Sequence, residues 1–170
     1  MPNIIPATEY GTVEEMDERF MREAVAMSRR GMQANQGGPF GAVVVRAGEV
    51  IATGTNQVTG TNDPTAHAEV VAIRNAGTKL ATFDLSDCEL YTSCEPCPMC
   101  LGAIYWSRFR HVYYANTRVD AAGIGFDDEL IYTELDKPMG ERLIPFTHLP
   151  LDEAAEVFSE WTVMEEKTRY

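Results

Sequence analysis

The spacing of apolar residues along the chain predicts a helix near the start, followed by two strands. Four apolar residues recur at helical intervals, and they are Met16, Phe20, Ala24 and Met27. Thr12 and Glu15 have the spacing of a capping box before this helix, and Gly31 is suited to its end. The apolar stretches at 37–45 and 50–56 are joined by the turn "RAGE", which is typical of a β-hairpin.

Beyond the hairpin, helical and strand patterns alternate. Residues 62–77 predict a second helix. Asp63 can cap its start, Pro64 suits its first turn and Gly77 can end it. The remaining pattern is a strand at 88–93, a third helix at 96–108 and a strand at 111–116. Because a strand–helix–strand unit favours a parallel pair of strands, we predict an α/β fold, a three-layer αβα sandwich with a mixed sheet.

The last part of the chain has a different pattern. Residues 136–150 are rich in proline and predict a connecting arm. The following segment has four apolar residues at helical spacing, and they are Leu151, Ala154, Phe158 and Trp161. Such a helix, between Leu151 and Glu166, needs an apolar surface in its own chain or in a partner. We therefore expect a single domain over residues 1–170, which ends in a helical segment at 151–170.

The composition limits the classes of partner. The 170 residues include 26 acidic and 14 basic side chains, for a net charge of −12. Because polyanions bind through clustered lysine and arginine, a nucleic-acid duplex is disfavoured and a small neutral substrate is favoured. No apolar run approaches the roughly 18 residues that span a membrane. The first twenty residues lack the pattern of a secretory signal, so we expect a cytoplasmic protein.

Three of the four cysteines, Cys94, Cys97 and Cys100, stand at every third position. A disulfide framework is typical of small secreted chains, and nothing in the sequence indicates secretion. An iron–sulfur cluster needs a fourth thiolate, whereas Cys88 lies in an alternating apolar stretch that suits the core of a strand. The pattern therefore favours a metal held by mixed ligands.

His67 is the candidate nitrogen ligand. It lies in the first turn of the second predicted helix, and Cys97 and Cys100 lie in the first turn of the third, on one face. If both helices start at one edge of the sheet, one imidazole and two thiolates form a zinc site whose fourth position is open to water. A structural zinc would need a fourth protein ligand, for which Cys94 is the candidate. The other two histidines are expected to be ordinary strand and loop residues.

Glu69 is the candidate general base. Zinc lowers the pKa of bound water from about 15.7 toward about 7, and a carboxylate two residues from His67 can accept the proton. The alternative is a solvated acid in the first turn of the helix, stabilised by the helix dipole. The signature H-x-E followed by P-C-x-x-C is typical of zinc deaminases. Four residues match it, and they are His67, Glu69, Cys97 and Cys100.

Further stretches add to this signature, and they are "GGPFGAVVV", "NDPTAHAEV", "YTSCEPCPMCLGAIYW", "GFDDELIY" and the final tyrosine. Through them the chain resembles the cytidine-deaminase superfamily, and within it the bacterial guanine deaminases, from Phe20 to Tyr170. The resemblance implies the αβα sandwich and one Zn²⁺ per subunit, held by His67, Cys97 and Cys100. It also implies a homodimer in which the C-terminal segment crosses to the neighbouring subunit.

The resemblance also implies roles in proton transfer and substrate binding. Glu69 would shuttle protons, and Asp128 would be a second polar contact or proton carrier. The implied substrate contacts are Asn56 as a hydrogen-bond partner of the base, Phe40 and Trp106 against its ring, Ala68, and Tyr170 as the residue that closes the pocket. Without the resemblance, the two ring contacts could equally be core residues, the asparagine a turn former and the aspartate a helix cap.

The implied reaction is the hydrolytic deamination of guanine to xanthine and ammonia. The same site could instead act on guanosine, cytosine, cytidine or an aminotriazine. A transfer-RNA adenosine would favour a basic surface, and this chain is acidic. A different class is a non-catalytic, zinc-stabilised interaction module, in which a fourth protein ligand would close the site.

Overall fold

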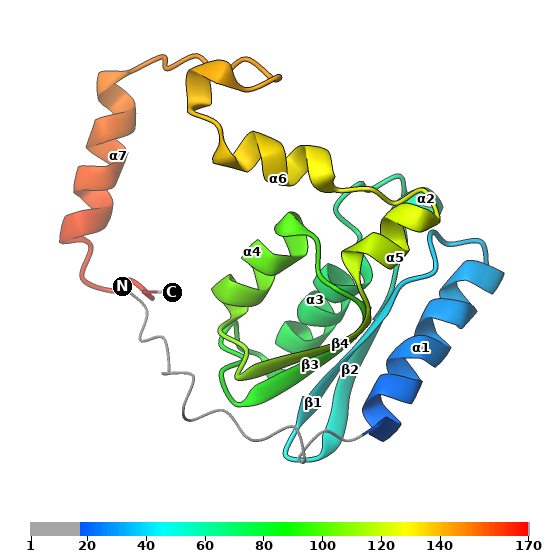
Figure 1. The fold of residues 1–170 in the computed structure, drawn as a ribbon. Helices are drawn as coiled ribbons and strands as arrows, with labels where there is room; N and C mark the ends of the chain where they lie inside the picture. The colour runs from blue at the N-terminus through cyan, green and yellow to red at the C-terminus, as the bar shows by residue number, and fades with distance from the viewer. Residues whose placement is uncertain (1–17, 170) are drawn as a thin grey trace. The chain divides into compact units, whose positions relative to one another are not determined.

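The computed structural model describes residues 18–169, and the residues up to Asp128 form a compact unit around a four-stranded sheet (Figure 1). Its strands are β1 (Gly41–Arg46), β2 (Glu49–Thr55), β3 (Cys88–Cys94) and β4 (His111–Asn116). The strand order is β2-β1-β3-β4, in which β1 is antiparallel to β2 and β3, and β3 is parallel to β4. The predicted hairpin and the predicted parallel pair are both confirmed.

Helices cover both faces of the sheet, which confirms the predicted three-layer fold (Figure 1). One face is covered by α1 (Glu18–Gln33), and the other by α3 (Ala68–Leu80) and α4 (Pro98–Ser107). Because alternate strand residues point to opposite faces, Val43 packs in the α1 layer and Val44 in the α3 layer. The period-two pattern of β1 and β3 therefore builds two separate apolar clusters.

The first helix continues past its predicted end. Gly31 lies inside α1, and a Cβ atom added to it would lie 2.7 Å from Thr55 Cβ. This glycine therefore allows α1 to approach β2 closely, and it does not end the helix. The predicted capping pair, Thr12 and Glu15, lies outside the described residues.

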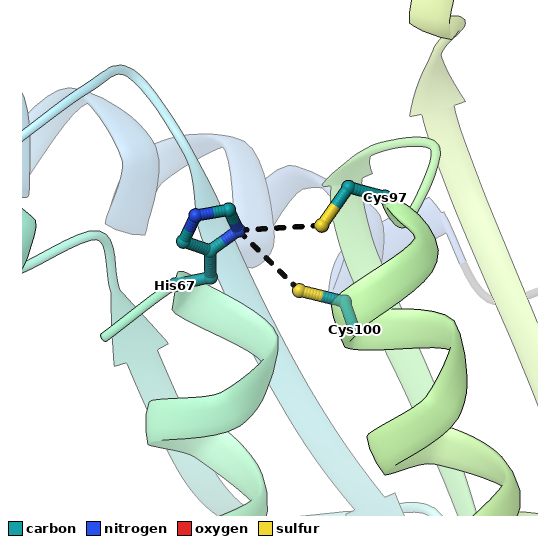
Figure 2. Close-up of side chains that lie close together, drawn as sticks. All are labelled: His67, Cys97 and Cys100. Atoms are coloured by element: carbon teal, nitrogen blue, oxygen red, sulfur yellow. Dashed lines mark hydrogen bonds between the residues drawn. The ribbon is translucent and has the colours of Figure 1, made fainter. Parts of the chain in front are cut away.

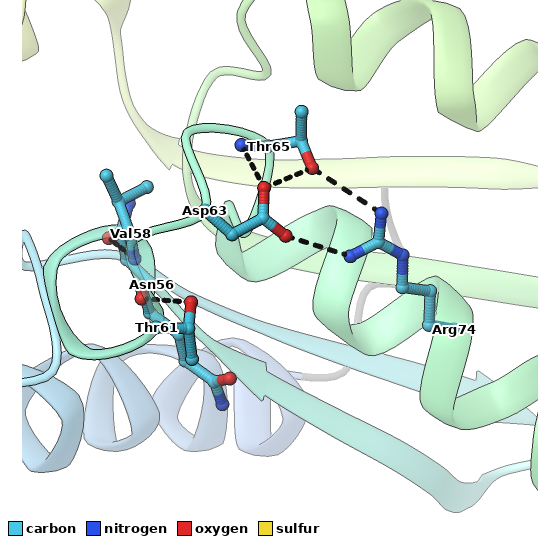
Figure 3. Close-up of polar contacts among 7 residues, drawn as sticks. Asn56, Val58, Thr61, Asp63, Thr65 and Arg74 are labelled. Atoms are coloured by element: carbon cyan, nitrogen blue, oxygen red, sulfur yellow. Dashed lines mark hydrogen bonds and ion pairs between the residues drawn. The ribbon is translucent and has the colours of Figure 1, made fainter.

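The helix α3 begins later than predicted. It starts at Ala68 with His67 as its N-cap, after a short helix α2 (Val58–Thr61). The predicted cap, Asp63, instead accepts hydrogen bonds from the Thr65 backbone N–H at 2.8 Å and the Thr65 hydroxyl at 2.7 Å (Figure 3). The aspartate closes a local turn before the helix, so the prediction of a cap at this position was wrong.

The helix α4 begins with Pro98, not with the predicted Pro96, and Cys97 is its N-cap. Proline suits the first helical position because its missing N–H would have no partner inside the helix.

The helix α3 ends later than predicted. At this end of α3, Gly77 is internal, and Ala81 is the C-cap with a left-handed φ of 53°. The predicted helix end at Gly77 was therefore also wrong.

The start of α3 lies directly against β2. A Cβ atom added to Gly54 would lie 2.1 Å from the Ala68 carbonyl oxygen and 2.6 Å from the Ala72 backbone nitrogen. Since glycine has no side chain, the two backbones can approach at this point. This contact fixes the helix start that presents His67.

Further helical segments follow β4. The helix α5 (Arg118–Gly123) begins with a capping box between Thr117 and Asp120. Residues 129–169 belong to a second compact unit with α6 (Glu129–Asp136), the 3-10 helix η3 (Met139–Glu141) and α7 (Asp152–Val163). The predicted C-terminal helix corresponds to α7. No helix among residues 18–169 is long and apolar enough to cross a membrane.

Candidate metal and catalytic site

Three side chains with metal-binding atoms converge where α3 and α4 begin (Figure 2). His67 Nδ1 lies 3.5 Å from Cys97 Sγ and 3.5 Å from Cys100 Sγ. The three donor atoms all lie within 4.8 Å of one another. A zinc ion, with bonds of about 2.3 Å to sulfur and about 2.0 Å to nitrogen, fits between donors at these separations.

The helix starts present these donors. His67 and Cys97 are N-cap residues with extended backbone, and neither side chain caps its own helix. Cys100 follows Cys97 by three residues, so the two sulfurs lie on one side of α4. The unpaired N–H groups at a helix start also favour a negatively charged sulfur. The structure thus brings together the three residues that the sequence pattern indicated.

The two sulfurs carry charge unequally. The pKa of Cys97 is lowered to about 4, first by the hydrogen bond from Cys100 and then by the bond with His67. The hydrogen bond with Cys97 and burial raise the pKa of Cys100, and the bond with Cys97 raises the pKa of His67. A divalent cation can replace the shared protons, because one imidazole and two thiolates are the donor set of zinc sites with an open position.

Cys94 does not join this cluster. Its sulfur donates to the Thr117 carbonyl oxygen at 3.6 Å, and burial raises its pKa to about 11. Cys88 is fully buried in β3, as predicted for a core residue. Among residues 18–169, the metal-binding group contains three side chains, so the geometry favours the open site over a structural site closed by Cys94.

Glu69 lies in the first turn of α3, beside the cluster. Its side chain is buried, with 6% of the residue exposed, so the alternative of a solvated surface acid is wrong. Its Oε1 atom accepts a hydrogen bond from Thr92 Oγ1 at 3.3 Å. Burial raises the pKa of this carboxyl, and the nearby Cys97 thiolate adds to the increase. A carboxyl with a raised pKa beside a metal site suits proton transfer near neutral pH.

Asn56 follows β2 and is buried. Its Oδ1 atom accepts hydrogen bonds from the backbone N–H groups of Gly38 at 3.3 Å and of Val58 at 3.2 Å. Because these donors fix which end of the amide is the oxygen, the Nδ2 group points the other way. A Cβ atom on Gly37 would lie 2.1 Å from Asn56 Oδ1, so this contact also requires glycine.

An aromatic pair lies next to this asparagine. Phe40 packs edge-on against Phe126, with ring centroids 4.9 Å apart and planes at 87°. Phe40 is half-buried and also contacts the apolar core on the α3 side of the sheet. Since a Cβ atom on Gly38 would lie 2.7 Å from the Phe126 ring, the second phenylalanine covers the loop that Asn56 holds.

Asp128 lies two residues after Phe126 and is half-buried. Burial raises the pKa of this carboxyl, and the charge of the Cys97 thiolate raises it further. The aspartate also directly precedes α6, as it would if it capped that helix. The electrostatic effect of Cys97 indicates that Asp128 lies near the metal-binding cluster.

The other predicted substrate contacts lie in different surroundings. Ala68 is fully buried in the core at the start of α3. Trp106 lies near the end of α4, and 71% of the residue is exposed in the single chain. Tyr170 lies outside the described residues.

His111, which was not expected to bind metal, lies in β4 as an ordinary strand residue. Its ring stacks on Tyr113 at a centroid distance of 4.2 Å.

The sequence patterns did not indicate two residues that contact this site. Phe126 lies in the stretch "GFDD", where an aromatic residue before two acids was a possible signal. Thr92 lies in β3 among apolar residues, where a hydroxyl needs a hydrogen-bond partner. Thr92 is two residues after Leu90, so both side chains point to the α3 side of the sheet. A hydroxyl on this side could have indicated a polar partner in α3, which is Glu69.

Comparisons with known proteins agree with this geometry. Residues 14–116 match the family described as "Cytidine and deoxycytidylate deaminase zinc-binding region". The chain is 54% identical to guanine deaminase of Bacillus subtilis (strain 168) over 153 residues, which cover 90% of this chain and 98% of that protein. The crystal structure of B. subtilis guanine deaminase has a TM-score of 0.88, at 54% identity, over 91% of this chain and 99% of that one.

Two other relatives are more distant. The structure of NE0047 in complex with 2,6-diaminopurine has a TM-score of 0.63 at 42% identity, over 65% of this chain and 62% of that one. A tRNA-specific adenosine deaminase of Aquifex aeolicus (strain VF5) is 35% identical over 144 residues, 85% of this chain and 92% of that protein. The chain therefore belongs to the cytidine and deoxycytidylate deaminase family of zinc-binding deaminases, and it is a homologue of guanine deaminase.

Proposed function

We propose that this protein is a zinc-dependent aminohydrolase that converts guanine and water into xanthine and ammonia. The observation that carries the proposal is the convergence of His67, Cys97 and Cys100 beside the buried carboxyl of Glu69. The identity of 54% to a guanine deaminase over nearly the whole chain supports the choice of guanine. In the overall reaction, the bond from C2 to the exocyclic nitrogen breaks and a bond from C2 to oxygen forms.

The proposed roles divide between the metal ligands and the carboxyl. Zinc held by the imidazole and the two thiolates supplies a Lewis acid that makes water nucleophilic near neutral pH. Glu69 would take one proton from that water and pass it to a ring nitrogen, and would then take the second proton from the oxygen added at C2 and pass it to the departing amine. Its burial and raised pKa support this role, because the carboxyl must hold the proton between the two transfers.

The proposed substrate contacts follow from the loops around the cluster. The Nδ2 group of Asn56 donates to an acceptor atom of the base, since the two backbone N–H groups on Oδ1 fix the amide orientation. Phe40 packs against the ring of the base, and Phe126 supports it edge-on. Asp128 acts as the second proton carrier. We propose that three more residues contact the substrate: Ala68, Trp106 and Tyr170.

A panel of amines tests this function. Purified protein with its zinc content measured is incubated with guanine, guanosine, cytosine, cytidine, adenine and an aminotriazine, and ammonia release is followed. We expect guanine to have a kcat/KM at least about tenfold above every other compound, with xanthine as the product. If another amine has the highest kcat/KM, that amine replaces guanine as the proposed substrate. If no amine releases ammonia from zinc-loaded protein, the enzyme proposal is wrong and the interaction module is favoured.

We also propose that the protein is a homodimer in which residues 151–170 pack on the second subunit. None of the described residues 129–169 is buried within their own unit, although this unit is rich in apolar side chains. The large exposed residues of α7 and its approach include Leu149, Leu151, Phe158 and Val163. Apolar surface of this extent needs a partner surface, so we propose a second copy of the chain.

The oligomeric state can be measured by light scattering after gel filtration. We expect twice the mass of 18.9 kDa for the natural chain and a loss of dimer for Phe158→Glu. A natural chain that remains monomeric at micromolar concentration would contradict the proposal. We further propose a cytoplasmic location, which is supported by four cysteines that form no disulfide with one another, as is typical of a reducing compartment.

A further inference from the structure

We infer that Thr92 is a positioning residue for the reaction, because its hydroxyl holds one oxygen of Glu69 and so directs the other oxygen toward the reacting water. The inference rests on the proposed deaminase function and adds a residue that lies in neither the metal-binding signature nor the substrate contacts. Thr92 acts through Glu69, whose carboxyl its hydroxyl contacts directly.

The geometry joins a helix to the centre of the sheet. Thr92 lies in β3 with 1% of the residue exposed, and its Oγ1 atom lies 3.3 Å from Glu69 Oε1. In the sheet it pairs with Ala42 of β1 on one side and with Tyr114 of β4 on the other. A hydroxyl in the middle of a four-stranded sheet has a nearly fixed position, so it is a rigid anchor for the carboxylate.

The presence of threonine instead of valine at this buried strand position indicates that the hydroxyl is needed for its hydrogen bond. Valine has the shape of threonine and suits a buried strand better, because a buried hydroxyl must find a hydrogen-bond partner. The neighbouring residue Ser93 points to the opposite face, where its hydroxyl accepts a hydrogen bond from the Gly41 N–H at 3.0 Å. The two adjacent hydroxyls thus have different partners: Ser93 binds backbone, whereas Thr92 donates to an acidic side chain.

This hydrogen bond affects the direction of proton transfer. A glutamate has three rotatable side-chain bonds, so its helix position alone does not fix where its oxygens point. With Oε1 held by Thr92 and a second side-chain hydrogen bond between the carboxyl and Cys100, the carboxylate has a defined direction relative to the ligands. The same strand β3 leads through residues 95 and 96 to Cys97, so one strand positions both the carboxylate and a sulfur ligand.

The test compares two substitutions that differ in the hydroxyl. Thr92→Val replaces the hydroxyl by a methyl group of similar size, and Thr92→Ser keeps the hydroxyl and removes the methyl group. For each protein, zinc content, melting temperature, kcat and KM for guanine are measured. We expect Thr92→Val to keep its zinc and its KM within about twofold and to lose about tenfold in kcat, whereas Thr92→Ser keeps most of the natural kcat.

Ser93→Ala is the matched control, because it removes a buried hydroxyl from the same strand on the opposite face. We expect its kcat to stay within about twofold of the natural value even if its melting temperature falls. An unchanged kcat for Thr92→Val would overturn the inference. Equal losses for Thr92→Val and Thr92→Ser would also overturn it, because the effect would then come from packing.

A second readout does not depend on turnover. Crystal structures of the natural protein and of Thr92→Val report the Glu69 side chain directly. We expect one orientation in the natural protein and a rotated or divided carboxylate in the variant. An unchanged single orientation in Thr92→Val would overturn the inference. If the natural protein deaminates no tested amine, the proposed function fails, and these structures still decide whether Thr92 positions the carboxylate.

Discussion

His67 Nδ1 lies 3.5 Å from Cys97 Sγ, although the two residues are 30 positions apart and belong to different helices. Both are N-cap residues, of α3 and of α4, so the cluster forms where two helices begin. The contact depends on the sheet, because β3 leads directly to Cys97 and β2 packs on the start of α3. A site built in this way is sensitive to changes in either ligand and in the backbone beneath it.

Removal of one sulfur should remove the metal. We expect Cys97→Ala to lose at least about 90% of its bound zinc after dialysis, because an open site with two protein ligands binds weakly. The measurement is elemental analysis of the purified protein. Cys94→Ser is the matched control, and we expect it to keep its zinc because the Cys94 sulfur contacts the Thr117 carbonyl. Loss of zinc from Cys94→Ser would show a fourth protein ligand and contradict the open site.

Glu69→Gln should separate metal binding from catalysis. The amide keeps the size of the side chain and cannot accept a proton, so we expect normal zinc content and a kcat lower by at least about 100-fold. Steady-state kinetics with guanine measure the effect. Glu49→Gln, at the exposed start of β2, is the control and should leave kcat unchanged. Full activity of Glu69→Gln with bound zinc would exclude the proposed role.

Asn56→Asp should weaken substrate binding, and its buried carboxyl should also lower the stability of the fold where it is charged. The aspartate can still accept the hydrogen bonds from Gly38 and Val58, but it puts an oxygen in place of the Nδ2 donor. We therefore expect KM for guanine to rise at least about tenfold, since an acceptor would face an acceptor atom of the base. Kinetics and a thermal melt measure the two effects. An unchanged KM would mean that Asn56 does not contact the base.

The buried carboxyl of Glu69 should make folding stability depend on pH in protein stripped of metal. Burial raises the pKa of this carboxyl above its usual value of 4.5. The buried charge therefore destabilises the folded protein fully at a pH above the folded pKa, and this destabilisation disappears as the pH falls below 4.5. We expect Glu69→Gln to be more stable than the natural protein at pH 8, by about 1 kcal/mol or more. Thermal melts from pH 8 to pH 5 should show this difference shrinking, and a constant difference would contradict the assigned cause.

Two glycine substitutions should have opposite effects on stability. Gly54→Ala places a Cβ atom 2.1 Å from the Ala68 carbonyl oxygen, so it must displace α3. We expect a loss of about 3 kcal/mol in the free energy of unfolding and weaker zinc binding, because His67 precedes Ala68. A Cβ atom on Gly102 in α4 meets nothing within 4 Å, so Gly102→Ala should gain about 0.5–1 kcal/mol. Urea denaturation measures both, and a stable Gly54→Ala would contradict the close contact.

The sequence predicted the parts of the fold that depend on local periodicity. The apolar run of β1 and the alternation around Cys88 in β3 indicated the strands, and the stretch from β3 through α4 to β4 indicated the parallel pair. The helix starts were less predictable, because Asp63 and Pro96 look like start signals. Asp63 binds Thr65 in a turn, and Pro98 takes the first position of α4, so both helices begin at the metal ligands instead.

The site was predictable where ligands lie on regular spacing and less predictable where a contact joins distant segments. Cys97 and Cys100 are related by a helical repeat, which the sequence displays directly. The hydrogen bond between Thr92 and Glu69 joins a strand to a helix 23 residues earlier in the chain, and no regular spacing relates the two residues. The amide orientation of Asn56 likewise depends on two backbone N–H groups that a sequence does not reveal.

The double contact of Asn56 also bears on how such an enzyme acquires new substrates. One end of its amide holds the loops at Gly38 and Val58, so a replacement that removes the Oδ1 acceptor also loosens the backbone around it. The Phe126 side chain has no polar atom to hold the backbone, and 46% of the residue is exposed beside Phe40. Directed evolution toward other amines should therefore accumulate its first changes at the aromatic pair and retain the asparagine.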